Sequence, residues 1–334
     1  METARVITQE KNAYVLQCAA GVHTATLAGR FRHEAVRKAD YPAVGDWVTV
    51  DLSQHPVIQS VLPRRSYFAR KPAISGGRKL KDGFMDGGST EEQIIAANID
   101  TAFIVMGMDG NFNIGRLERY ITLVYNSGAA PVVILNKADL CSQPELYVSQ
   151  VQAVGPGIPV HLVSAASGAG MEELNQYLGP GQTVLFVGSS GVGKSTLINR
   201  LQGEERLKTR AVSDATGKGR HTTTAAQLVA HPSGCMVVDT AGVRELQLWC
   251  DEEALDHSFE DVVSLTRNCR YSDCQHQREP GCAVRQAVAD GLLSPDRFES
   301  YKKLHTELGR LKARQRQWES HLARQRKQKG LPAE

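Results

Sequence analysis

The sequence has no apolar run long enough to span a membrane, and its first residues, METARVITQEKNAY, have no apolar core of the kind found in signal peptides. No internal repeat is visible. Cysteine is scarce and odd in number, with seven in 334 residues, of which three lie within 14 residues beside a histidine. This usage favours a reducing compartment and a metal site over a disulfide framework. We therefore expect a cytoplasmic protein that does not contact membranes.

Neither sign of charge dominates, because the net charge is only +3. The charge is nevertheless unevenly placed. Residues 1–90 carry thirteen Lys and Arg against eight Asp and Glu, and residues 297–329 carry eleven against three, so the middle of the chain is acidic. Basic ends predict a polyanionic partner. A solvated basic face on a C-terminal helix would explain the second excess as well, and this alternative stays open.

The order of secondary structure predicts more than one domain. The N-terminal part has short segments rich in Val, Thr, Leu and aromatic residues, which predict a small β-barrel of the OB or SH3 type. Residues 71–90 contain five glycines and no periodicity, and they predict a flexible link. From residue 99 to 246 apolar strands alternate with helical stretches, which is typical of a mainly parallel α/β sheet. Residues 296–329 predict one long basic helix.

The segment GSSGVGKS (188–195) matches the phosphate-binding pattern G-x-x-x-x-G-K-[ST]. It follows the apolar strand TVLFV and opens the helix STLINRL, so a chance glycine-rich turn is a poor explanation. Backbone N–H groups at such a helix start can surround phosphate oxygens. Lys194 would reach the β- and γ-phosphates, and the Ser195 hydroxyl would bind Mg²⁺. The expected phosphate site comprises Gly188, Ser189, Ser190, Gly191, Val192, Gly193, Lys194, Ser195 and Thr196.

Two other segments at strand ends are suited to a guanine base. In NKAD (136–139) the Asp139 carboxylate can accept both the N1–H and the 2-amino group of guanine, which adenine cannot match. SAAS (164–167) can offer a backbone N–H to guanine O6, or be a plain surface loop. Ligands bind at the carboxyl ends of parallel strands, where these segments would meet. The candidates are Asn136, which would tie the loop to the site, Lys137, whose stem would lie over the base, Asp139, Ser164 and Ala165, whose N–H is the one expected at O6.

DTAG (239–242) ends a further strand downstream of the phosphate loop. Asp239 can hold Mg²⁺ directly or through water, and the Gly242 N–H can meet the γ-phosphate. All parts of a GTP site are then present, but the base reader precedes the phosphate loop, which reverses the usual order. The ends of a compact domain often lie close together, so joining them and opening the chain elsewhere preserves a site. The sequence therefore predicts a circularly permuted GTPase domain.

GRHTTT (219–224) lies where a mobile switch with a Mg²⁺-binding threonine is expected. Val243 follows DTAG at the place where many G proteins have a glutamine that orients water. His221 is the candidate substitute, although a structural histidine is an equal alternative. The predicted catalytic residues are Lys194 and His221, and the predicted Mg²⁺ ligands are Ser195 and Thr223, with Thr222 and Thr224 left open.

CRYSDCQHQREPGC (269–282) carries three cysteines and a histidine. A Cys₃His set suits tetrahedral Zn²⁺, and one ion per chain would hold a segment too small to bury a core of its own. A few reduced cysteines are the alternative, which four ligands so close together make the poorer one. The predicted ligands are Cys269, Cys274, His276 and Cys282.

The order NKAD, SAAS, GSSGVGKS, GRHTTT, DTAG and cysteine–histidine set resembles the ribosome small subunit-dependent GTPase A (RsgA) family, and the likeness includes VGDWV in the N-terminal part. The resemblance implies a multidomain fold with an N-terminal OB-fold β-barrel, a circularly permuted P-loop α/β GTPase domain and a C-terminal α-helical zinc-binding domain. It also implies late maturation of the 30S subunit, binding to 16S rRNA, GTP hydrolysis stimulated by the subunit, and His221 as the catalytic histidine. Ala241 departs from the family, in which proline is usual.

Two hypotheses for the function compete. In the first, the protein is an enzyme, a monomer that docks on rRNA through its basic ends, hydrolyses GTP to GDP and then dissociates. In the second, it is an RNA-binding assembly or checkpoint factor whose affinity GTP merely sets. A P-loop ATPase or kinase is a third possibility, against which NKAD argues. The predicted domains are residues 1–75 (OB-fold), 76–92 (linker), 93–250 (GTPase domain) and 251–334 (zinc-binding and basic helical domain).

Overall fold

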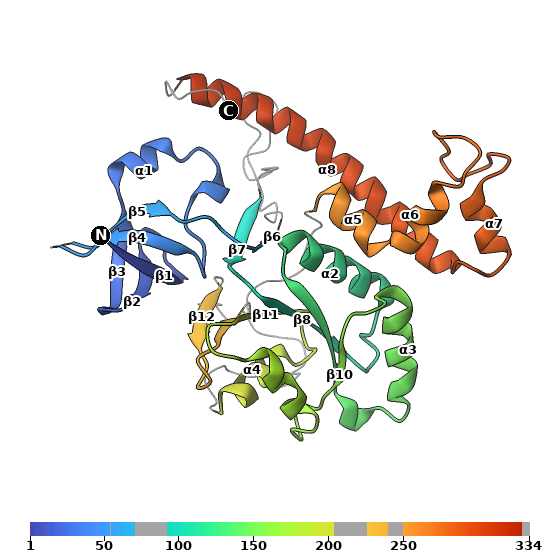
Figure 1. The fold of residues 1–334 in the computed structure, drawn as a ribbon, viewed down its shortest axis with the longest axis horizontal. Helices are drawn as coiled ribbons and strands as arrows, with labels where there is room; N and C mark the ends of the chain where they lie inside the picture. Colours follow the sequence, from blue (N-terminus) through green and yellow to red (C-terminus); the bar gives the residue numbers. More distant parts are fainter. Residues whose placement is uncertain (54, 71–91, 204–225, 240–249, 329–334) are drawn as a thin grey trace, which may run out of the picture.

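Figure 1 shows the fold in a computed structural model, which describes residues 1–53, 55–70, 92–203, 226–239 and 250–328. A β-barrel, a central sheet flanked by helices and a set of C-terminal helices follow one another along the chain. The predicted linker lies outside the described residues except for its last residue. Within the described part of the chain, no helix has the length and apolar character needed to cross a membrane.

The N-terminal strands close into a five-stranded barrel. Their order is β1-β2-β3-β5-β4, and β4 returns to pair with β1. This is the barrel of an OB-fold, so the predicted fold of this part is confirmed. Alternate apolar side chains such as Val48 and Val50 point inward and form its core. The strands are β1 (Glu2–Gln9), β2 (Tyr14–Cys18), β3 (Gly21–Leu27), β4 (Trp47–Asp51) and β5 (Val57–Val61).

The connection between β3 and β4 is helical. It contains α1 (Gly29–Glu34) and the 3-10 helix η1 (Lys38–Asp40). Strand β3 ends at Leu27, the last residue that pairs with β5. The N–H of Ala28 still donates to the carbonyl oxygen of Ile58 (3.0 Å), and the chain then turns into α1 at Gly29.

The central sheet is mainly parallel, as predicted. Its order is β10-β9-β8-β11-β13-β12, and only the edge strand β12 runs antiparallel to its neighbour β13 within this set. The strands can be renumbered 1 to 6 in the order β11, β12, β13, β8, β9, β10. Read across the sheet from β12 to β10, the order is then 2-3-1-4-5-6. A domain joined between β10 and β11 and reopened between β13 and β8 gives this arrangement. The strands are β8 (Thr101–Gly107), β9 (Ala130–Asn136), β10 (Val160–Leu162), β11 (Thr183–Val187), β12 (Gln227–Ala230) and β13 (Met236–Asp239).

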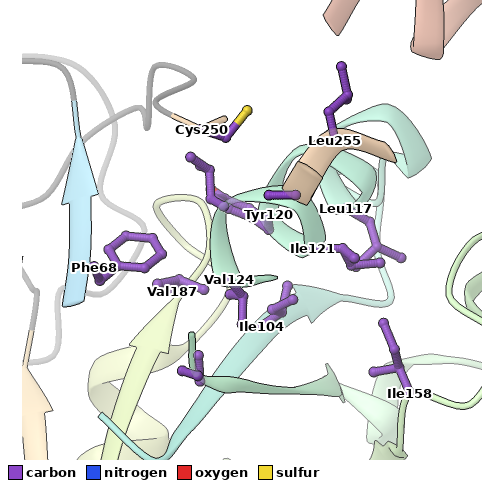
Figure 2. Packing of buried hydrophobic residues seen from close by; sticks show 14 of the residues in the cluster. Phe68, Ile104, Leu117, Tyr120, Ile121, Val124, Ile158, Val187, Cys250 and Leu255 are labelled. Atoms are coloured by element: carbon purple, nitrogen blue, oxygen red, sulfur yellow. The ribbon is translucent and has the colours of Figure 1, made fainter. Parts of the chain in front are cut away.

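Helices cover both faces of this sheet (Figure 1). Ile104 of β8 points toward α2, whereas its neighbour Phe103 points to the opposite face, toward α4 and η3. Figure 2 shows the larger core, where Ile121 of α2 lies near Ile104, with Phe68 at one side and Leu255 of α5 at the other. The helices are α2 (Ile114–Ser127), α3 (Pro144–Val154), α4 (Lys194–Gln202), η2 (Ala138–Leu140) and η3 (Met171–Tyr177).

The barrel is joined directly to the central sheet. Strand β1 pairs with β12 through Thr8 and Gln227, so that one continuous sheet runs through both parts. The buried Arg5 donates to the hydroxyl of Thr183 (2.7 Å), at the start of β11. Two further strands, β6 (Tyr67–Arg70) and β7 (Gln93–Ala97), form an antiparallel pair between barrel and sheet.

The C-terminal helices pack on α2. They are α5 (Glu252–Ser258), α6 (Glu260–Thr266), α7 (Ala283–Ala289) and α8 (Pro295–Gln328). Near the start of α8 the buried Arg297 forms ion pairs with Glu118 of α2 (2.8 Å) and Asp261 of α6 (2.9 Å). Leu304 and Leu308 continue this buried face, and α8 then runs on past α5 (Figure 1).

Candidate functional site

The segment 188–195 joins β11 to α4, as its sequence predicts. Gly193 has a φ of 97°, and a Cβ at this position would collide with the side-chain amide of Asn136. A Cβ at Gly188 would likewise collide with the carbonyl oxygen of Val105. Both positions require glycine, because the loop runs directly against the neighbouring strands β8 and β9.

Lys194, the first residue of α4, turns back over this loop. Its ammonium donates to the carbonyl oxygens of Gly188 (2.6 Å) and Ser189 (2.8 Å). Burial lowers the pKa of Lys194 to about 8, and the charge of Asp239 only partly opposes this effect. A phosphate group beside Lys194 would supply negative charge and favour the protonated amine.

The other residues of the phosphate loop and the first turn of α4 form a place where an anion can bind. Ser190 and Gly191 are exposed at the tip, while Val192 is buried in the core beneath α4. Ser195 and Thr196 are half-buried in the first helical turn. The first N–H groups of a helix have no partner within it, which makes a helix start of this kind suited to an anion.

Asn136 joins three loops through one side chain. It is the last residue of β9 and is 2% exposed. Its amide NH₂ donates to the carbonyl oxygen of Val192 in the phosphate loop (2.7 Å), and its oxygen accepts the N–H of Ala165 (3.0 Å). The structure thus brings NKAD, SAAS and the phosphate loop together. Asp139 lies in η2 and is exposed, so its carboxylate is accessible to a ligand.

SAAS differs from expectation in one detail. The N–H of Ala165, expected to meet guanine O6, donates to Asn136 here. Ser164 is buried, and its hydroxyl accepts the N–H of Ser167 (3.1 Å), which shapes the turn. Arg200 of α4 holds the turn from outside by donating to the carbonyl oxygen of Ser167 (2.6 Å). Arg200 was not predicted, because an arginine on a helix carries no sequence signal for this contact.

Lys137 is held by a residue that sequence reasoning also missed. Its Nζ lies 2.6 Å from Oδ2 of Asp109, which follows β8. Burial raises the pKa of Asp109, but the hydrogen bonds from Lys137 and Asn111 outweigh it and hold this pKa below its ordinary value. The one available signal was position, since Asp109 follows an apolar strand at the same edge of the sheet.

The switch residues are described only in part. Asp239 ends β13, which lies beside β11, so it reaches the predicted edge of the sheet. The other residues expected here lie outside the described part of the chain: His221, Thr222, Thr223, Thr224, Ala241, Gly242 and Val243. Their roles remain predictions.

A second group of predicted residues lies between α6 and α7. The ligand atoms of Cys269, Cys274, His276 and Cys282 all lie within 4.8 Å of one another. Nδ1 of His276 is 3.5 Å from Sγ of Cys269 and 3.4 Å from Sγ of Cys282, and these two sulfurs are 3.9 Å apart. Around a tetrahedral zinc ion, bonds of about 2.3 Å to sulfur and about 2.05 Å to nitrogen separate two sulfurs by about 3.8 Å and sulfur from nitrogen by about 3.5 Å. The four residues therefore fit a zinc ion.

Comparison with known proteins agrees with this geometry. Residues 61–249 match a family described as RsgA GTPase. A small ribosomal subunit biogenesis GTPase RsgA from Opitutus terrae is 46% identical over 316 residues, which cover 91% of this chain and 83% of that protein. The chain belongs to the RsgA GTPase family.

Other RsgA-like proteins match over a similar length. The RsgA of Syntrophotalea carbinolica is 43% identical, and the match covers 98% of this chain and 89% of that protein. The crystal structure of YjeQ from Thermotoga maritima has a TM-score of 0.67 at 28% identity, covering 92% of this chain and 98% of that one. YloQ, described as a circularly permuted GTPase, has a TM-score of 0.62 at 23% identity, covering 92% and 95%, and supports the fold alone. The predicted RsgA fold and GTPase activity class are thus confirmed.

Proposed function

We propose that this RsgA-family protein acts as a GTPase in the late maturation of the 30S ribosomal subunit. Its relatives are named as small ribosomal subunit biogenesis GTPases. The observation that carries the proposal is the side chain of Asn136, which ties the NKAD loop to the phosphate loop and to Ala165. A ligand that spans these three loops needs both a base and a phosphate chain, and the carboxylate of Asp139 selects guanine.

In the proposed complex the phosphates of GTP lie in residues 188–196 and its base lies at Asp139. Lys194 exchanges its two carbonyl partners for oxygens of the β- and γ-phosphates, which are stronger acceptors for a buried ammonium. Asp239 and the N–H of Gly242 are the groups proposed to act at the γ-phosphate. These residues position the phosphate chain and stabilise the charge that develops when the terminal bond breaks.

Mg²⁺ is proposed to accompany GTP. The Ser195 hydroxyl and the Asp239 carboxylate supply oxygen donors near the phosphate loop, and oxygen is the ligand that Mg²⁺ prefers. Thr223 is the proposed donor from the switch. When bound, the ion neutralises charge on the β- and γ-phosphate oxygens. His221 is the proposed group that orients the attacking water, since Val243 has no polar side-chain atom for this role.

The Cys₃His cluster is proposed to hold one structural zinc ion. Three spacings between its ligand atoms, from 3.4 to 3.9 Å, suit a tetrahedral ion. Four protein ligands leave no open coordination position, as in structural sites. The ion would fasten Cys269, just after α6, to Cys282, which caps α7.

The proposed partner is 16S rRNA on the 30S subunit, bound by a monomer in the cytoplasm, where subunits mature. Arg310, Arg314 and Arg324 are exposed along α8, and they can approach phosphates. The other basic excess, in residues 1–90, comes from seven Lys and Arg and no Asp or Glu between positions 64 and 81, just after the barrel strands.

The test is the rate of GTP hydrolysis with and without purified 30S subunits. We expect strong stimulation of the wild type, and we expect His221→Ala to keep its affinity for GTP while losing the stimulated turnover. GTP-dependent binding to 30S without stimulation would instead support an assembly factor in which GTP only sets affinity. Equal hydrolysis of GTP and ATP would contradict the proposal.

A further inference from the structure

A carboxylate outside the recognised motifs is directed at the base-reading lysine. Asp109 lies two residues beyond the end of β8, and its Oδ2 is 2.6 Å from Nζ of Lys137. Its Oδ1 accepts the backbone N–H of Asn111 (2.9 Å). One oxygen therefore fixes the carboxylate to its own loop, and the other is left for the lysine.

The backbones that carry these two side chains are fixed to each other. Gly107 of β8 pairs with Asn136 of β9, and the N–H of Met108 donates to the carbonyl oxygen of Asn136 (2.9 Å). A Cβ at Gly107 would come within 3.1 Å of the Asp109 carboxylate, so the glycine leaves the space that this carboxylate occupies. The register of the sheet thus places Asp109 opposite Lys137.

The NKAD loop is held at each of its first three residues. Asn136 is held by the phosphate loop, and the N–H of Ala138 donates to the carbonyl oxygen of Val163 (3.0 Å). Lys137 between them has a φ of 69°, a left-handed conformation that residues other than glycine adopt rarely. Asp109 holds the side chain of this residue.

We propose that Asp109 is a positioning residue for guanine nucleotides, which fixes the Lys137 ammonium so that the lysine stem is preformed over the face of the base. The inference rests on the proposed function, in which Lys137 covers guanine. Each side chain is 25% exposed, and a bound base would displace water and strengthen the pair. Because an ordered lysine loses less freedom on binding, the benefit belongs to nucleotide affinity and not to the hydrolysis step.

The test measures affinity of the full-length chain for a fluorescent GDP analogue. Asp109→Ala is expected to weaken binding by about tenfold. Asp109→Asn keeps an acceptor for the Asn111 N–H but loses the charge, so it should show a similar loss in a folded protein. Asp109→Glu should recover part of the affinity. Glu145→Ala, at an exposed carboxylate in the first turn of α3, is the matched control and should bind GDP like the wild type.

A double-mutant cycle separates positioning from a general structural effect. If Asp109 acts through Lys137, adding Asp109→Ala to Lys137→Ala should change the affinity by less than about twofold. KM for GTP should rise while kcat at saturating GTP stays the same. Wild-type affinity in both the Ala and Asn variants, a fully additive cycle, or a fall in kcat would overturn the inference. A wild-type chain that binds no GDP would instead contradict the proposed function.

Discussion

Single residues organise the nucleotide site before any nucleotide arrives. The side-chain NH₂ group and oxygen of Asn136 both form hydrogen bonds with neighbouring loops, and Lys194 donates to two carbonyl oxygens of the phosphate loop. The two side chains differ in the free-energy cost of their burial. The amide is neutral and satisfied, whereas the ammonium is buried, and its pKa falls to about 8 as a result. The loops of the site are therefore already held together, and a phosphate beside Lys194 would favour its protonated form.

Nucleotide binding should be coupled to proton uptake by Lys194. With a pKa of about 8, Lys194 is about half deprotonated near pH 8 in the nucleotide-free protein, and phosphates should return the pKa toward or above its ordinary 10.5. Affinity for GDP should therefore fall as the pH rises above about 8. Calorimetry at pH 8.5 in buffers of different ionisation enthalpy should show uptake of roughly three quarters of a proton per GDP. Binding without proton uptake would contradict the assignment.

At the scale of elements, the cysteine–histidine segment links two short helices, α6 and α7, of seven residues each. Helices of this length are not stable by themselves in water. Val262 and Val284 anchor them in the larger core, and the segment between them is otherwise exposed over much of its length. The proposed zinc ion, held by the four ligands, would therefore crosslink this segment.

Removal of zinc should loosen this region and leave the nucleotide site intact. The purified protein should contain about one zinc ion per chain. After chelation, or in Cys274→Ser, amide hydrogens of residues 269–282 should exchange much faster, while affinity for GDP stays unchanged. Cys141→Ser is the matched control, because this cysteine lies outside the cluster. Unchanged exchange in a metal-free protein would contradict a structural zinc site.

The elements that the sequence predicted are those with strong, regular patterns. β8, β9 and β11 are buried on both faces, and their apolar runs were read directly as strands. Gly128 and Gly203 end α2 and α4 in the left-handed conformation that glycine favours at such ends. In contrast, β12 and β7 are short, and they become strands by pairing with β1, β13 or β6. Such pairing over long chain distances leaves no local pattern.

The same distinction applies to the site. The motif residues were predictable because their chemistry requires fixed spacing along the chain. Asp109 and Arg200 were not, because their partners Lys137 and Ser167 lie 28 and 33 residues away, and the sheet register decides whether they meet. The donation of the Ala165 N–H to Asn136 is likewise a consequence of packing between two loops.

At the scale of the whole molecule, both added parts are attached firmly to the GTPase sheet. The barrel continues that sheet through β1 and β12, and Arg5 reaches Thr183 on the strand that leads into the phosphate loop. The C-terminal helices are fastened by Arg297 to Glu118. Along the chain, β12 lies between the predicted switch and DTAG, so the strand that joins the sheet to the barrel is flanked by both segments.

The basic residues of α8 between positions 310 and 327 should contribute to 30S binding through phosphate contacts. Neutralising five residues should weaken binding to 30S. It should also reduce the slope of log affinity against log salt concentration (the salt slope) by up to roughly one unit for each lost contact. GDP affinity should not change, which serves as the control for folding. The substituted residues are Arg310, Arg314, Arg324, Arg326 and Lys327. If 30S affinity and its salt slope both survive, α8 presents only a solvated face, and the barrel must carry the docking.

The central claim is that motifs in reversed order form one guanine-nucleotide site, and the most direct measurement is base selectivity at Asp139. The affinities of GDP and its xanthine analogue XDP are compared for the wild type and Asp139→Asn, with Glu145→Gln as an exposed control. An amide presents one acceptor and one donor, so the variant should lose about a hundredfold or more in GDP affinity and prefer XDP. If Asp139→Asn still prefers GDP to the same degree as the wild type, the NKAD loop does not read the base and the account is wrong.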